Sequence, residues 1–133
     1  MLAASVMISD PLCVAVGATS AEVAALMRTR NISIVPVIDN PKDRRYLGTV
    51  SDRDIVVECV ALGHDPKECS VQDHMRTDTI VVTTETELTG YKLAKYLVPT
   101  DHHIRTTMVV VDGKKKVVGF IPHPEEIQGI LIE

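Results

Sequence analysis

The fold is decided by LGTVSDRDIV, residues 47–56, which joins a strand pattern directly to a helix start. Its first four residues suit a strand, whereas Ser51 can accept a backbone N–H as a helix N-cap and Asp54 places a carboxylate in the first turn. Upstream lies ISIVPVID, residues 32–39, which is rich in β-branched residues. The turn-rich residues 40–45 lie between this run and residues 47–56. We therefore expect a β-hairpin that leads into a helix.

Helix signals flank this hairpin on both sides. Thr19-Ser20-Ala21-Glu22 is a capping box, and the apolar residues after it recur at helical spacing, which predicts a helix over about residues 20–30. Gly63 is placed to close the helix that follows the hairpin. Pro36 cannot donate to a ladder, so we expect a free edge or a bulge at that position.

The second half of the chain repeats this order of elements. Residues 84–87 form a second capping box, and the runs 108–111 and 117–121 flank a turn that contains Gly113. A β-α-β-β-α unit thus occurs twice, which predicts an α/β (α+β) fold. Each copy has only about 60 residues, which is small for independent stability, so the two copies are expected to pack together.

Composition and charge disfavour several classes of protein. The 133 residues include 14 Lys and Arg against 18 Asp and Glu, and their scatter disfavours nucleic acid as a partner, because phosphate binding needs clustered positive charge. No run is long enough for a membrane span, and no signal peptide is recognisable. The three cysteines are odd in number and lack C-x-x-C spacing, which fits a reducing compartment. We expect a cytoplasmic protein with no nucleic-acid or membrane partner.

The two repeats resemble the CBS domain, and the whole chain resembles a CBS-domain pair, or Bateman module, of the stand-alone bacterial or archaeal type. The residues that carry the resemblance are VPVID (35–39) and LGTVSDRDIV (47–56). The resemblance implies a first repeat over residues 5–62, a linker over 63–69 and a degenerate second repeat over 70–128. It also implies pseudo-two-fold symmetry between the repeats and a disc-like homodimer.

The same resemblance implies a regulatory module that senses an adenosine-containing ligand in the cleft between the repeats. The candidate ligands are AMP, ADP, ATP and S-adenosylmethionine. Similar CBS domains hold the ribose with the carboxylate of a [Ser/Thr]-x-x-[Asp/Asn] signature, and a carboxylate can accept from both ribose hydroxyls. The expected ligand-binding residues are Ser51, Asp52, Arg53, Asp54, Ile80, Val81, Arg105, Thr106, Thr107 and Met108. Among the residues of the second half, Arg105 is expected to meet phosphate.

Two observations keep other interpretations of this signature open. The spacing of Ser51 and Asp54 is also that of a helix cap, which needs no ligand. The equivalent positions of the second repeat are Pro122-His123-Pro124-Glu125, which lack both the hydroxyl and the aspartate. We therefore expect one nucleotide site instead of two, with an unidentified effector protein responding to it.

Two other functions stand beside ligand sensing. The first is a ligand-free interaction scaffold that binds its partner through exposed apolar helix faces. The second, less favoured, is a zinc-binding protein that uses Cys59, His64, Cys69 and His74, which recur every five residues. That period does not keep ligands on one helical face and matches no common zinc motif. No G-x-S-x-G, H-E-x-x-H or phosphate-loop motif occurs, so we expect no enzyme, no catalytic residues, no metal site and no required cofactor.

Overall fold

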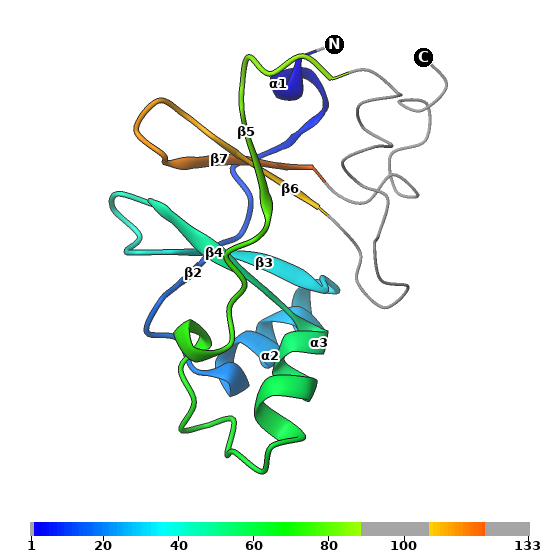
Figure 1. Cartoon of the computed structure of the whole chain (residues 1–133), viewed down its shortest axis with the longest axis vertical. Coiled ribbons are helices and arrows are strands. Elements are labelled where there is room, and N and C mark those ends of the chain that lie inside the picture. The colour runs from blue at the N-terminus through cyan, green and yellow to red at the C-terminus, as the bar shows by residue number, and fades with distance from the viewer. Residues whose placement is uncertain (1, 89–106, 122–133) are drawn as a thin grey trace. The chain divides into compact units, whose positions relative to one another are not determined.

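Packing divides the chain into two compact units, which Figure 1 traces from blue at the N-terminus to orange near residue 120. The computed structural model describes residues 2–88 and 107–121. The first unit is Leu12–Asp78, and the second unit combines Met1–Pro11 with Thr79–Glu133. The repeat boundaries expected from the sequence stay a prediction, because these units are defined by packing and not by sequence similarity.

The first unit contains the β-α-β-β-α order expected from the sequence. Its sheet has the strand order β2-β3-β4, in which β2 runs parallel to β3 and β3 runs antiparallel to β4. The helices α2 and α3 lie against this sheet (Figure 1). The elements are β2 Val14–Ala15, α2 Ser20–Arg30, β3 Ile34–Ile38, β4 Tyr46–Ser51, α3 Asp52–Ile55, a π-helical turn Val56–Val60 and a 3-10 turn Val71–Asp73.

Helix α2 begins and ends where its local signals predict. The Glu22 N–H donates to Oγ1 of Thr19 at 3.1 Å, and the Thr19 N–H donates to Oε2 of Glu22 at 3.5 Å. At the other end Asn31 adopts a left-handed conformation with φ 54°, which stops the helix. The helix buries its apolar side in the core of the first unit, which consists of Val14, Val23, Met27, Val35, Val37, Val50, Ile55 and Val71.

Strand β3 accommodates Pro36 because its neighbour β2 is short. Pairing between β2 and β3 involves only Val37 and Ile38 of β3, so the ladder on that side starts after the proline. The register of the β3–β4 hairpin also shifts between Val37 and Ile38. The expected irregularity therefore lies just beyond the proline.

The second unit contains a four-stranded sheet of order β1-β7-β6-β5. β5 runs parallel to β6, whereas β1 and β6 both run antiparallel to β7, so the hairpin predicted for the second half is confirmed. The described elements are α1 Ala3–Val6, β1 Ile8–Ser9, β5 Ile80–Thr83, β6 Met108–Val111 and β7 Val117–Ile121. The buried core consists of Ala3, Val82, Leu88, Met108, Val110 and Ile121.

The capping box expected at residues 84–87 does not begin a helix at that point. Glu87, which would lie in the first helical turn, instead forms an isolated antiparallel bridge with Leu2. The spacing was correct for a capping box, but pairing with the N-terminal segment decides the conformation. The rest of the expected helix falls in residues 89–106, which lie outside the described residues.

In each unit, the sheet pairs at one edge with a short segment. In the sequence, that segment lies directly before a strand of the other unit. β1 precedes β2 in the chain, yet it pairs with β7 of the second unit. Arg76 precedes β5, yet it bridges Thr49 on β4 of the first unit. This exchange explains why the second unit is built from two separate parts of the chain.

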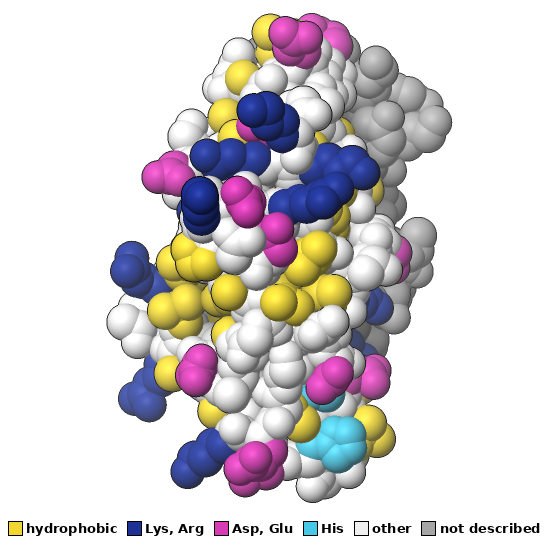
Figure 2. All heavy atoms as spheres, turned by 90° about the vertical axis from the view of Figure 1, so that its left-hand side faces the viewer, with side chains coloured by type: hydrophobic (Ala, Val, Ile, Leu, Met, Phe, Trp, Pro, Cys, Tyr) yellow, Lys and Arg dark blue, Asp and Glu magenta, His cyan; other side chains and the backbone are white. Residues whose placement is uncertain are grey.

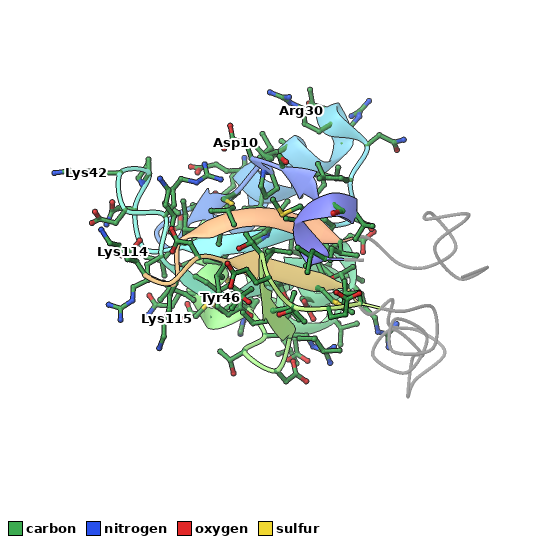
Figure 3. The ribbon with its side chains drawn as sticks, turned by 90° about the horizontal axis from the view of Figure 1, so that it is seen from above. Asp10, Arg30, Lys42, Tyr46, Lys114 and Lys115 are labelled. Atoms are coloured by element: carbon green, nitrogen blue, oxygen red, sulfur yellow. The ribbon has the colours of Figure 1, made fainter. Side chains whose placement is uncertain are left out.

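The surface carries charges of both signs. Basic and acidic side chains are interspersed on the face that Figure 2 shows. Lys42 lies in the loop of the β3–β4 hairpin, and Lys114 and Lys115 lie in the loop of the β6–β7 hairpin (Figure 3). Within residues 2–88 and 107–121, no helix is both long and apolar enough to cross a membrane.

Candidate functional site

The start of α3 is the region in which the sequence predicts a ligand signature. The Asp54 N–H donates to Oγ of Ser51 at 3.1 Å, and the Ser51 N–H donates to Oδ2 of Asp54 at 2.9 Å. This is a complete capping box, so the helix-cap interpretation that the sequence left open is confirmed. The cap uses only one of the two carboxylate oxygens of Asp54.

The other carboxylate oxygen of Asp54 faces a guanidinium group. Nε of Arg76 lies 3.5 Å from Oδ1 of Asp54. The Asp54 side chain is 10% exposed and the Arg76 side chain is 40% exposed. The carboxylate is therefore held between a backbone N–H and an arginine that reaches solvent. Such a pair offers an acceptor for hydroxyl groups and a cation for an anion at the same place.

Gly48 and Thr49 determine where Arg76 lies. The Thr49 N–H donates to the carbonyl of Arg76 at 2.9 Å, and the Arg76 N–H donates to the carbonyl of Thr49 at 2.7 Å. A Cβ atom at Gly48 would collide with the carbonyl oxygen of Arg76. The absence of a side chain at Gly48 therefore lets the segment before β5 approach β4 and bring Arg76 to Asp54.

Arg76 is the residue of this site that the sequence analysis missed. It lies outside the [Ser/Thr]-x-x-[Asp/Asn] signature, and no motif connects it to Asp54. The one available signal was Gly48, because a glycine within a strand indicates a close approach of another backbone. That signal does not say which segment approaches.

The two middle residues of the signature are arranged differently from its ends. Asp52 and Arg53 are both exposed, whereas Asp54 is buried. Oδ1 of Asp52 accepts the N–H of Arg53 at 2.8 Å. The Asp52 N–H donates to the carbonyl of Ser33 at 2.9 Å, which ties the helix start to the residue before β3. Both middle side chains are thus accessible from solvent.

Four of the other predicted ligand-binding residues lie in the described part of the second unit. Ile80 and Val81 belong to β5, and Val81 is 41% exposed. Met108 pairs with Ile80 across the sheet and is fully buried in the core. Thr107 is buried, and its Oγ1 has no hydrogen-bond partner within the described residues. The two remaining residues, Arg105 and Thr106, lie outside the described residues. The ligand-binding role of this set stays a prediction.

Three side chains of the kind that bind soft metal ions meet elsewhere in the first unit. The Sγ atoms of Cys59 and Cys69 and a ring nitrogen of His74 lie within 4.8 Å of one another. Cys59 and His74 are buried, and Cys69 is half-buried. Desolvation raises the pKa of the Cys69 thiol, and a hydrogen bond with Cys59 raises it further. The sequence predicts no metal site here, because the regular spacing of these residues gives no reason to place them together.

Known sequences resemble this chain both as a family model and as a whole protein. Residues 3–60 match the family model of the CBS domain. An uncharacterized protein of Methanopyrus kandleri is 32% identical over 110 residues, which are 83% of this chain and 53% of that protein. The chain therefore spans about half the length of the curated relative that it matches.

Comparison with solved structures extends the likeness over nearly the whole chain. The structure of hypoxic response protein I with two coordinated zinc ions matches with a TM-score of 0.76 at 22% identity, covering 97% of this chain and 98% of that one. A CBS-pair protein of Arabidopsis thaliana matches with a TM-score of 0.77 at 21% identity, covering 98% and 94%. At these identities the likeness concerns the fold alone. The family match identifies a CBS domain over residues 3–60, and the chain has the mixed α and β fold of CBS-pair structures.

Proposed function

We propose that this chain is a regulatory module that binds an adenosine-containing ligand at the start of α3. The match to the CBS domain over residues 3–60 supports a regulatory role in preference to a catalytic one. The candidate ligands are AMP, ADP, ATP and S-adenosylmethionine. The observation that carries the proposal is the ion pair between the buried carboxylate of Asp54 and the half-exposed guanidinium of Arg76.

The carboxylate of Asp54 suits the ribose. A ribose presents two neighbouring hydroxyl donors, and an ionised carboxylate has about four lone-pair sites, of which Ser51 and Arg76 use only some. The Ser51 N–H fixes the carboxylate before a ligand arrives, which reduces the entropy lost on binding. Asp54 is therefore a preorganised acceptor for ribose hydroxyls.

The guanidinium of Arg76 suits a phosphate. Its planar fork of N–H donors matches phosphate oxygens, and its exposed part can meet a ligand without unfolding the segment. The pair therefore favours a phosphate-bearing adenosine ligand over S-adenosylmethionine.

Arg76 also gives the bound ligand a way to act on the rest of the chain. Arg76 lies in the segment that leads from the first unit into β5. A ligand phosphate that draws the guanidinium away from Asp54 changes the contacts of this segment. Differential binding to two arrangements of the segment would shift their populations, which is the basis of a regulatory response.

The test is ligand binding by matched aspartate variants. We expect wild-type protein to bind at least one of the four ligands in isothermal titration calorimetry. A ligand at 100 times its dissociation constant should add about 2.7 kcal/mol to the free energy of unfolding, which differential scanning fluorimetry will detect as a higher melting temperature. Asp54→Asn keeps the size of the side chain and an acceptor for the cap, but it should lose most of the affinity.

The matched control is Asp43→Asn, which removes the same charge from an exposed position in the loop between β3 and β4. We expect its affinity to stay close to that of the wild type. Binding that is equally strong in Asp54→Asn would contradict the assignment of Asp54. A wild-type protein that binds none of the four ligands would contradict the proposed function as a whole.

A second candidate function is supported by an exposed apolar surface on the helix that continues α3 and on the turn that follows it. Val56, Val57, Val60 and Leu62 are 57%, 38%, 52% and 62% exposed. Covering this apolar surface with a second copy of the chain or with an effector protein is more favourable than leaving it in contact with water. We propose the homodimer as its occupant in the absence of an effector.

The oligomeric state tests this second candidate. Sedimentation velocity should give a dimer for the wild type and a monomer for a Val56→Lys/Val60→Lys double variant. Ala24→Lys, which adds charge at an exposed position on α2, is the control and should remain dimeric. A wild type that sediments as a monomer at high concentration would contradict the homodimer.

A further inference from the structure

We propose that the first unit contains a zinc site in which Cys59, Cys69 and His74 are ligands and His64 completes the coordination. This inference goes beyond the nucleotide site and does not depend on it. It rests on the positions of the four side chains, on the burial of two of them and on an unsatisfied nitrogen.

The three ligand atoms are close to the spacing that a zinc ion needs. They lie within 4.8 Å of one another, so a central point is at most about 2.8 Å from each of them. Zinc binds thiolate sulfur at about 2.3 Å and imidazole nitrogen at about 2.0–2.1 Å. Shifts of less than about 1 Å, within the reach of side-chain torsions, would bring all three atoms to bonding distance.

His74 supplies a second, independent observation. The residue is 7% exposed, and its Nε2 is buried without a hydrogen-bond partner within the described residues. Buried polar atoms are almost always satisfied, so an unsatisfied nitrogen in the histidine that meets two thiols requires an explanation. A metal ion bound at Nε2 would accept its lone pair and remove the cost of burying it.

The backbone shows why residues at a spacing of five converge. Cys59 lies in the π-helical turn Val56–Val60, a geometry found often at functional sites. Gly63, with φ 80°, reverses the chain, and the N–H of His64 donates back to the carbonyl of Cys59 at 3.0 Å. The returning segment places Cys69 beside the helix, and the 3-10 turn Val71–Asp73 ends at His74.

His64 is placed to take the fourth position. The centroids of the His64 and His74 rings are 6.2 Å apart, and the planes of the rings are inclined by 31°. His64 is exposed, so its side chain can change rotamer at low cost. The histidine side chains visible in Figure 2 lie together near the lower end of the molecule.

The set of ligands selects zinc over other common ions. Two thiolates and two imidazoles are the ligands of tetrahedral structural zinc sites, whereas calcium and magnesium require oxygen. No open position remains once His64 binds, so the site would stabilise the fold and would not activate water. Its effect is to fasten the segment between Gly63 and His74 onto the helix.

The test is zinc binding by untagged protein, purified without oxygen and in a reductant that does not bind metal. We expect one zinc ion per chain by mass spectrometry of the metal after loading and desalting. Cobalt(II) in place of zinc should give the visible bands of a tetrahedral site and a thiolate charge-transfer band. Zinc should also raise the melting temperature by several degrees.

Variants separate the site from adventitious binding. Cys69→Ser and His74→Gln should each lose the stoichiometric zinc, and neither change removes an apolar core residue. His64→Gln should weaken the affinity in a chelator competition by about tenfold or more, since one of the four ligands is lost. Cys13→Ser, which changes the third cysteine, should bind zinc as the wild type does, and circular dichroism will check that each variant is folded.

Two results would overturn the proposal. The first is a wild-type protein that retains no zinc after loading. The second is stoichiometric zinc in the folded double variant Cys69→Ser/His74→Gln. An unchanged affinity in His64→Gln would overturn the assignment of His64 as the fourth ligand.

Discussion

The β3–β4 hairpin of the first unit and the β6–β7 hairpin of the second unit are closed in the same way. Oδ1 of Asp39 accepts the N–H groups of Asn40 and Arg45 at 2.7 and 2.9 Å. Oδ1 of Asp112 accepts the N–H groups of Lys114 and Lys116 at 2.8 and 2.9 Å. An aspartate directly after the first strand thus organises both turns, although the second turn is two residues shorter.

The two hairpins differ in what packs on the glycine of their second strand. A Cβ atom at Gly48 would meet the carbonyl oxygen of Arg76, whereas a Cβ atom at Gly119 would meet the side chain of Met7. Backbone cannot move without breaking its bridge to β4, but a methionine side chain is flexible. The two equivalent glycines therefore tolerate an added side chain to different extents, because a distant segment supplies the group that packs against each of them.

The largest expected effect follows from that difference. Gly48→Ala should lower the free energy of unfolding by about 3 kcal/mol, since the segment that carries Arg76 must leave β4, whereas Gly119→Ala should cost about 1 kcal/mol. Gly17→Ala, where a Cβ atom has open space, is the control. Urea denaturation measures all three, and equal costs at Gly48 and Gly119 would remove the distinction between the hairpins.

The next effect tests the N-terminal part of the second unit. Ala3 is fully buried in the core of that unit, whereas Ala4 is exposed. Ala3→Leu should lower the free energy of unfolding by about 2 kcal/mol through overpacking, and Ala4→Leu should change it by less than about 0.5 kcal/mol. Similar values for the two variants would show that α1 does not pack in this core.

A smaller effect concerns the helix that follows the first hairpin. Ser51→Ala removes the hydroxyl that accepts the Asp54 N–H and should lower the free energy of unfolding by about 1 kcal/mol. Ser51→Asn should recover most of this loss, because asparagine also caps helices well. Ser33→Ala, at an exposed position, is the control for chemical denaturation. A loss in Ser51→Asn as large as in Ser51→Ala would contradict the capping role.

The smallest effect is a pH dependence at the turn of the second hairpin. The backbone hydrogen bonds from Lys116 and Lys114 hold the pKa of Asp112 below its ordinary value. The stability that the carboxylate adds is therefore fully present above its ordinary pKa and is lost as the pH falls through the lowered folded value.

Thermal unfolding as a function of pH measures this contribution. The difference in stability between wild type and Asp112→Asn should shrink on acidification across that window and stay constant above it. A difference that does not vary with pH would show that the charge of Asp112 is not what stabilises the turn.

Much of the fold follows from local signals in the sequence. Thr19 and Glu22 mark the start of α2, Ser51 marks the start of α3, and Gly63 reverses the chain after it, as predicted. These signals act over three or four residues, so their effect does not depend on the rest of the chain. The prediction at residues 84–87 was wrong because Glu87 pairs with Leu2, a contact across most of the described sequence.

The candidate sites were predictable only in part. The [Ser/Thr]-x-x-[Asp/Asn] signature identified Asp54, but nothing in it indicated Arg76. The cluster of Cys59, Cys69 and His74 was disfavoured because a period of five does not follow one helical face. That argument fails here since Cys59 alone of the three lies in a helix and the chain turns back after it.

The sequence by itself determined the order of the elements in the first half, both hairpins and the caps of two helices, because these depend on near neighbours in the chain. The tertiary structure decided which segment packs on Gly48, which residue pairs with Asp54, and which thiols meet His74. Those contacts form when chain reversals bring distant residues together, and their register is set by the packing of strands and loops. Local sequence patterns carry no record of that register.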